Sequence, residues 1–231
     1  MQKTIFPAPK WNGASAAYQR LFDATAAARL AYFRTLGEPG PILSDPTARG
    51  EPASRWPNTP AWQCIRGQGN TVIASSGLTA PFAEADGPNV GFGIETAVAT
   101  SDPVPDDVRG TWLLELALAV SNQAAMDGQF QRRHQQFGVF LFSTRAPAGS
   151  FKGWLDQTGD LAILIGVPVT GHSTEIDLPA GSASLLMAKL LTPAEFSFVV
   201  ARGPEGAQKL VEAFAADGSG HFSSLQRTSV V

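Results

Sequence analysis

Apolar and weakly polar side chains recur at helical spacing near the start of the chain, between residues 14 and 36. They are Tyr18, Leu21, Phe22, Thr25, Tyr32, Phe33 and Leu36. Residues three or four apart lie on one face of a helix, and Gly37 stands where a glycine often ends one. We therefore predict an amphipathic helix, and we assign residues 1–38 to an N-terminal helical segment packed on the rest of the domain.

A run of prolines follows this helix. The prolines are Pro39, Pro41, Pro46, Pro52, Pro57 and Pro60. Proline donates no backbone hydrogen bond, and it restricts the residue before it. Residues 39–61 are therefore predicted to form a proline-rich surface loop, and residues 62–231 to form the main body of what is a single domain overall.

Patterns of period two predict the first strands. Residues 62–65 and 71–75 flank a Gly-Gln-Gly-Asn sequence at 67–70, which favours a hairpin because glycine and asparagine tolerate the positive φ of tight turns. Farther along, alternation over residues 91–100 predicts another strand. One face of that strand carries Phe92, Ile94, Thr96 and Val98.

An apolar run, Trp112–Val120, is rich in alanine and leucine. These residues favour a helix over a strand, so we predict a largely buried helix over about residues 110–125. Two shorter runs of β-branched and aromatic residues, 139–142 and 161–169, are typical of central strands.

The C-terminal region carries start and stop signals for two helices. Thr192 and Glu195 have the spacing of a capping box, with a proline at the first helical position. This helix is predicted to end at Gly203, and a second one to begin at Pro204 and end at Gly218. Strands interleaved with helices, without a strict βαβ rhythm, favour an α+β fold with a mixed β-sheet flanked by helices.

Composition narrows the class of protein. The chain is 44% hydrophobic and 16% charged, which excludes a disordered chain. A net charge of −3 argues against nucleic-acid binding, which draws on a basic surface. With Cys64 as the single cysteine, no internal disulfide forms. The N-terminus lacks the apolar core of a signal peptide and no stretch is long enough to span a membrane, so we expect a cytoplasmic protein that binds neither nucleic acid nor membrane.

One cluster of polar residues suggests metal chemistry. His172, Glu175 and Asp177 lie close in sequence, and an imidazole with two carboxylates can bind a divalent cation. On a strand, however, Glu175 and Asp177 share one face while His172 points to the other. A solvated loop after the 161–169 strand is the favoured interpretation, and a hydrolase or metal-dependent enzyme at these three residues is kept as the alternative.

No other pattern completes a catalytic or cofactor site. Ser75 and Ser76 precede a glycine but lack the nucleophile-elbow sequence. The pairs Gly67/Gly69 and Gly91/Gly93 lack the third glycine of a dinucleotide loop, and are interpreted as turn and strand glycines. Polar neighbours place His134 in a solvated segment. We assign no catalytic residue and expect no cofactor.

Glu95 differs from these, because it is a lone carboxylate in an otherwise uncharged strand. A carboxylate on a covered sheet needs a partner such as arginine or backbone amides. It either marks a groove for a ligand or partner, or it faces water or makes one structural ion pair. The second interpretation is favoured.

The sequence resembles the suppressor-of-fused (SUFU-like) domain family. The resemblance rests on Thr71–Phe82 (TVIASSGLTAPF), Gly91–Glu95 (GFGIE) and the helix that begins at Trp112. It is best over residues 62–142, and looser to the end of the chain. The motif residues, interpreted as structural, are Ser76, Gly77, Leu78, Gly91, Gly93, Glu95 and Trp112.

The resemblance implies an α+β domain that has no known catalytic activity and binds other proteins. Animal members bind a transcription factor of Hedgehog signalling, partly by taking its peptide as an added β-strand, and bacterial members are presumed immunity proteins of toxin systems. This chain has the length of a single lobe of the animal proteins. We expect a bacterial, non-catalytic protein-binding domain, an immunity or inhibitor protein that masks a toxin or other partner as a monomer or homodimer.

Overall fold

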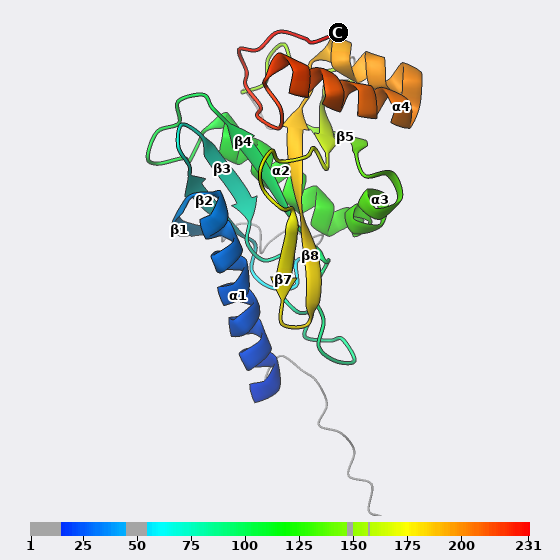
Figure 1. Ribbon diagram of the computed structural model, residues 1–231. Coiled ribbons are helices and arrows are strands. Elements are labelled where there is room, and N and C mark those ends of the chain that lie inside the picture. Colours follow the sequence, from blue (N-terminus) through cyan, green and yellow to red (C-terminus); the bar gives the residue numbers. More distant parts are fainter. Residues whose placement is uncertain (1–14, 45–54, 147–149, 157) are drawn as a thin grey trace, which may run out of the picture.

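The computed structural model describes residues 15–44, 55–146, 150–156 and 158–231. Within them the chain forms one mixed β-sheet of eight strands and four helices (Figure 1). The helices are α1 (Ala16–Leu36), α2 (Trp112–Asp127), α3 (Phe130–Phe137) and α4 (Pro193–Asp217). The strands are β1 (Glu38–Ser44), β2 (Ala61–Arg66), β3 (Thr71–Ser75), β4 (Ile94–Thr100), β5 (Phe140–Arg145), β6 (Asp160–Ile165), β7 (Glu175–Leu178) and β8 (Gly181–Leu190).

The strands follow the order β1-β2-β3-β4-β8-β6-β5, and β7 pairs with β8 beside β6. Strands β4 and β8 are parallel, with Ile94 opposite Ser184, and the remaining neighbours are antiparallel. The predicted α+β class with a mixed sheet is confirmed.

The N-terminal helix forms as predicted, with Ser15 as its N-cap and Gly37 after its last residue. The proline-rich loop is corrected in its first part, because β1 pairs with β2 from Glu38 to Ser44. This strand tolerates prolines because it lies at the edge of the sheet, where the backbone N–H groups on its outer side pair with no neighbouring strand. Its register with β2 also shifts between Pro39 and Ile42. Residues 45–54 of the predicted loop lie outside the described part of the chain.

The predicted hairpin is confirmed as β2 and β3, whose turn is closed by the Gly67 amide donating to the Asn70 carbonyl at 3.0 Å. The predicted 91–100 strand begins later than expected, at Ile94. Gly91 and Gly93 have φ of 59° and 68°, so they belong to the turn before β4 and are not strand glycines.

Helix α3 and the β7–β8 hairpin were missed by the sequence patterns. The polar segment around His134 forms helix α3, whose first residue, Phe130, is buried. The predicted 161–169 strand ends at Ile165, and the region after the following loop forms the β7–β8 hairpin. Strand β8 is central, since it pairs with β4, β6 and β7.

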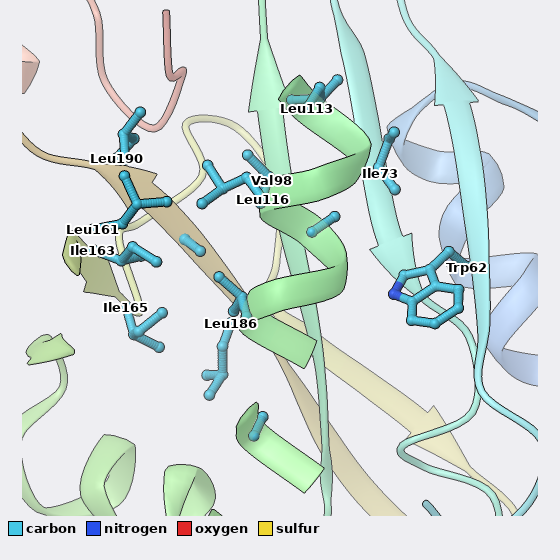
Figure 2. Packing of buried hydrophobic residues seen from close by; sticks show 14 of the residues in the cluster. Trp62, Ile73, Val98, Leu113, Leu116, Leu161, Ile163, Ile165, Leu186 and Leu190 are labelled. Atoms are coloured by element: carbon cyan, nitrogen blue, oxygen red, sulfur yellow. The ribbon is translucent and has the colours of Figure 1, made fainter. Parts of the chain in front are cut away.

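Both faces of the sheet are covered. On one face, α2 packs its apolar side on residues from β2 to β8 (Figure 2). The buried indole of Trp62 donates a hydrogen bond to Ser121 Oγ of α2 at 2.8 Å. On the other face, α1 covers one apolar cluster through Phe33, and α4 covers a second through Leu210 and Phe214. The C-terminal segment also packs on this face, since Phe222 contacts the cluster under α1.

The two predicted C-terminal helices form one kinked helix, α4. Its capping box is present, with Thr192 Oγ1 accepting from the Glu195 amide and Glu195 accepting from the Thr192 amide. Gly203 has non-helical φ and ψ of 61° and −143°, and Pro204 follows it. The predicted break at Gly203 is therefore a kink within a continuous element, and the predicted stop at Gly218 is confirmed by its left-handed conformation.

Candidate functional site

Glu95 lies completely buried on the sheet face that α1 covers. Its carboxylate accepts hydrogen bonds from the backbone amides of Gly77 (3.1 Å), Leu78 (3.3 Å) and Thr79 (3.0 Å). The hydroxyls of Ser75 and Thr79 also donate to it, the latter at 2.7 Å. One charged side chain thus holds the whole turn that follows β3.

The same carboxylate ties α1 to the sheet. Arg29 of α1 is 3.6 Å from Glu95 and donates to Thr79 Oγ1 at 2.9 Å and to Ser76 Oγ at 3.3 Å. The Arg29 side chain is only 7% exposed. Of the two interpretations of Glu95, the contacts match the structural ion pair, extended by hydrogen bonds, and no groove opens at this residue.

The remaining motif residues surround this network. Leu78 is fully buried, and its carbonyl accepts from the Phe92 amide at 2.8 Å. A side chain at Gly91 would collide with the carbonyl oxygens of Leu78 and Ala80, and one at Gly93 with the amide of Gln131. Gly91 therefore lets the turn before β4 pass close to the turn after β3, and Gly93 lets it pass close to α3.

Trp112 begins helix α2 directly after its N-cap, Thr111, and packs half-buried against the main apolar cluster. The motif residues therefore form two turns, a helix start and one ion pair. The contacts of these residues maintain the fold.

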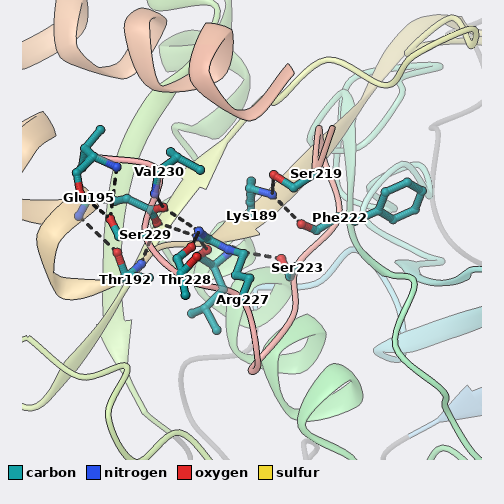
Figure 3. A network of polar contacts seen from close by, with 12 residues as sticks. Lys189, Thr192, Glu195, Ser219, Phe222, Ser223, Arg227, Thr228, Ser229 and Val230 are labelled. Atoms are coloured by element: carbon teal, nitrogen blue, oxygen red, sulfur yellow. Dashed lines mark hydrogen bonds and ion pairs between the residues drawn. The ribbon is translucent and has the colours of Figure 1, made fainter. Parts of the chain in front are cut away.

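A second buried ion pair lies at the far end of the sheet. Arg227 binds Glu195 through both guanidinium nitrogens, each at 2.5 Å, and donates to the Leu190 carbonyl at 2.7 Å (Figure 3). Glu195 is fully buried and also completes the capping box of α4. The pair therefore fastens the C-terminal segment to the start of α4 and to the end of β8.

Lys189 of β8 is also fully buried. It donates to Ser219 Oγ at 3.3 Å and to the Phe222 carbonyl (Figure 3). Its ammonium also lies 4.2 Å from the centre of the Phe214 ring. Burial, and next the positive charge of Arg227, lower the pKa of Lys189 to about 7. Met187, two positions earlier on the same face of β8, belongs to the cluster under α1, and Phe214 belongs to the cluster under α4, so Lys189 lies where these two clusters meet.

The predicted metal-ligand trio is not brought together. Glu175 and Asp177 do share one exposed face of β7, whereas His172 lies in the exposed loop before it. Among the described residues, no three side chains of His, Cys, Asp or Glu gather closely enough to hold a metal ion. Cys64 is buried, and burial raises the pKa of its thiol, as expected for an inert cysteine.

The sheet ends in two unlike edges. At one end, β1 carries two prolines and a register shift, features that protect an edge from further pairing. At the other end, β5 has neither proline nor irregularity, and it pairs with β6 in unbroken register from Phe140 to Arg145. No described strand pairs with the outer side of β5.

An apolar groove lies beside the start of β5. It has a volume of about 240 Å³, and Phe137, Leu141, Val200 and Pro204 are among its lining residues. The Phe137 and Val200 side chains are 46% and 60% exposed. Gly203 and Pro204, at the kink in α4, are among the residues that line this groove. The predicted helix break therefore forms part of the groove wall.

Sequence patterns missed this region for a physical reason. The groove joins the end of α3, the start of β5 and the middle of α4, which only the tertiary structure places together. A signal did exist for Lys189, because it is a lone charge in an apolar run, as Glu95 is.

Comparison with known proteins supports the fold. No protein-family model matches the sequence, and no curated protein matches it. A chain in the crystal structure of the Sufu-Fu complex superposes with a TM-score of 0.56 over 91% of this chain and 92% of that chain, at 13% sequence identity. Within the described residues, no helix combines the length and the apolar character needed to cross a membrane.

At 13% sequence identity the similarity concerns the fold alone, and the superposition includes nearly the whole length of both chains. The predicted resemblance is confirmed at that level: the chain has a SUFU-like α+β fold.

Proposed function

We propose that this chain is a non-catalytic domain that binds and masks one protein partner, and that the partner is a toxin for which the chain is the immunity protein. The observation that carries the proposal is the unprotected outer edge of β5 next to an apolar groove. An extended segment of the partner adds to this edge as a further strand and inserts an apolar side chain between Phe137 and Val200.

Three observations support a protein partner. The similar chain comes from a complex, that of Sufu and Fu. Exposed apolar side chains gather at the groove, as at surfaces that bind proteins. The motif residues that resemble the SUFU-like family are absorbed by the fold, which leaves the edge as the candidate surface. The assignment to a cytoplasmic bacterial toxin system rests on that resemblance, and the chain acts as a monomer or homodimer.

The partner is identified by retention on the tagged protein from host lysate, over a salt series, followed by mass spectrometry. We expect one stoichiometric protein that is toxic when expressed alone and harmless when co-expressed with this chain. A retained protein that is harmless when expressed alone would contradict the immunity role.

The edge is tested with a pair of neighbouring proline substitutions, Ser143→Pro and Thr144→Pro. Successive amides of a strand point to opposite sides, so one of these substitutions breaks the pairing with β6 and the other blocks only the outer edge. The free energy of unfolding distinguishes them. We expect the variant that keeps its stability to lose partner binding, and unchanged affinity in that variant would rule out strand addition at β5.

The groove is tested separately with Val200→Lys, matched by Met126→Lys on α2, whose side chain is 44% exposed. We expect the first to weaken partner binding at least tenfold and the second to leave it unchanged. Equal effects of the two would show that the groove is not part of the interface.

A further inference from the structure

A second cavity lies on the opposite side of the sheet from α2, between the end of α1 and the segment that follows α4. It has a volume of about 380 Å³. Leu36 of α1 and Phe222 of the final segment form its walls, and Val72 and Met187 contribute from the sheet. Asn70, Thr170, His172 and His221 add its polar groups. It is distinct from the groove beside β5, with which it shares no residue.

His221 is the unusual member of this lining. Only 8% of the residue is exposed, and it lines the cavity. Its imidazole lies tilted by 36° against the Phe222 ring, with 4.1 Å between the ring centres, and it forms no hydrogen bond with any described residue. Neither ring nitrogen is among the fully enclosed polar atoms that lack a partner, so both reach the open space of the cavity and are available to a ligand there.

The state of this imidazole restricts what that partner is. Burial lowers the pKa of His221 to about 4, with smaller contributions from Lys189 and His172. At neutral pH the ring is therefore neutral and has one N–H donor and one acceptor nitrogen. The N–H can donate to a ligand oxygen.

The charges around the cavity are biased to one sign. No Asp or Glu is among the lining residues, so no negative charge stands in the cavity wall. Lys189 lies directly behind the final segment, since it donates to Ser219 and to the Phe222 carbonyl. The carboxylates that act on Lys189, those of Glu195 and Asp217, do not line the cavity. A negatively charged group is favoured here over a cation.

We propose that this cavity binds a small organic acid. The carboxylate accepts hydrogen bonds from His221 and His172, and the apolar body of the ligand packs on Val72 and Met187. A cavity with an apolar floor and a few convergent polar groups is the usual form of a small-molecule site. Such a ligand would satisfy the buried imidazole and would fasten α1, the β6–β7 loop and the C-terminal segment to one another.

The proposal is tested with benzoate and benzamide, two probes of nearly equal shape that differ in charge. Binding to the purified chain is followed by calorimetry and by amide chemical shifts. We expect saturable benzoate binding with shifts confined to the cavity lining, and at least tenfold weaker binding of benzamide. Equal affinity for the two probes, or no shift with benzoate and with a series of aliphatic carboxylates, would overturn the proposal.

Three histidine variants locate the site. His221→Phe keeps an aromatic ring against Phe222, and we expect at least a tenfold loss of benzoate affinity. His172→Ala changes an exposed side chain and tests the site even where His221→Phe impairs folding, and a loss of at least threefold is expected. His134→Ala on α3 is the control and should bind benzoate as the parent does.

Two further outcomes would contradict the anion site. Unchanged benzoate affinity in both His221→Phe and His172→Ala would place the binding elsewhere. Stabilisation by zinc chloride that is lost in His172→Ala, without any benzoate binding, would assign the histidine pair to a cation. Neither readout requires the protein partner, so failure of this proposal and failure of the proposed function are distinguished.

Discussion

Replacement of Glu95 by glutamine is the sharpest test of the buried network. Glu95→Gln keeps the volume of the side chain but replaces one acceptor oxygen with a donor. That oxygen position now faces amide and hydroxyl donors, and the Arg29 guanidinium, 7% exposed, loses its counter-charge. The perturbation is therefore electrostatic and leaves packing nearly unchanged.

The expected loss is large. Removing one partner of a buried ion pair costs about 3–5 kcal/mol, because the other charge remains buried without compensation. Hydrogen bonds to a charged group contribute about 1.5–3 kcal/mol each, and glutamine retains only part of them. We expect Glu95→Gln to lose about 4 kcal/mol of unfolding free energy, which for a chain of this size corresponds to a fall in Tm of about 8–16 °C.

The assay is urea denaturation followed by tryptophan fluorescence and circular dichroism, with Arg29→Met and the double variant completing a cycle. Asp107→Asn is the matched control, since the Asp107–Arg109 pair is 66% and 73% exposed, and we expect it to cost less than about 0.5 kcal/mol. A loss below about 1 kcal/mol for Glu95→Gln, with the fold intact, would refute the structural role and return Glu95 to the candidates for a binding surface.

Three further predictions follow from buried groups and backbone geometry. The pKa of Lys189 is about 7 in the folded chain, against 10.5 ordinarily, so between these pH values the unfolded chain binds one more proton than the folded chain. The free energy of unfolding should therefore rise with pH in this range. Urea titrations at several pH values should show this rise, and Lys189→Met should flatten it. Glu195→Gln should cost about 3–5 kcal/mol in the same assay, since Arg227 is left buried, and a loss under about 1 kcal/mol would contradict this. Gly91→Ala should lower Tm far more than Gly110→Ala, because both have positive φ but only Gly91 has carbonyl oxygens in the way; equal shifts would show that the close approach is unimportant.

Local signals predicted those elements whose cause is local. The capping box at Thr192 and Glu195 forms as expected, because its hydrogen bonds join residues three apart. Helix α2 follows from an apolar run of good helix formers, and the β2–β3 hairpin from a four-residue turn. Helix α3 was missed because it lacks such signals: its N-cap, Gln129, makes no side-chain hydrogen bond, and its middle is polar.

The β7–β8 hairpin and strand β1 were not predicted from the sequence, for a different reason. Strand β8 is buried over most of its length on both faces, so it shows no alternation of polar and apolar residues. Strand β1 contains prolines that argue against a central strand, and it is tolerated only because it lies at an edge. The choice between edge and centre is a property of the whole sheet.

For the candidate sites, too, the sequence indicated some properties and the tertiary structure alone gave the partners. Glu95 was recognised as a charge that needs a partner, since its strand is otherwise uncharged. Its actual partners, Arg29 and the turn after β3, lie far away in sequence. The trio His172, Glu175 and Asp177 was suggested by closeness in sequence, but the β7 geometry separates it. His172 instead lines a cavity with His221, 49 positions later in the chain.

The sequence by itself therefore determined the fold class, most helices, the first hairpin and the need for a buried counter-charge. These depend on side-chain periodicity, on hydrogen bonds between near neighbours and on the cost of burying charge, all of which can be evaluated along the chain. The tertiary structure alone decided which edge of the sheet stays open, where α4 meets β5 to form a groove, and that His221 faces a cavity without a partner. These depend on pairings between distant segments, whose geometry no local pattern encodes.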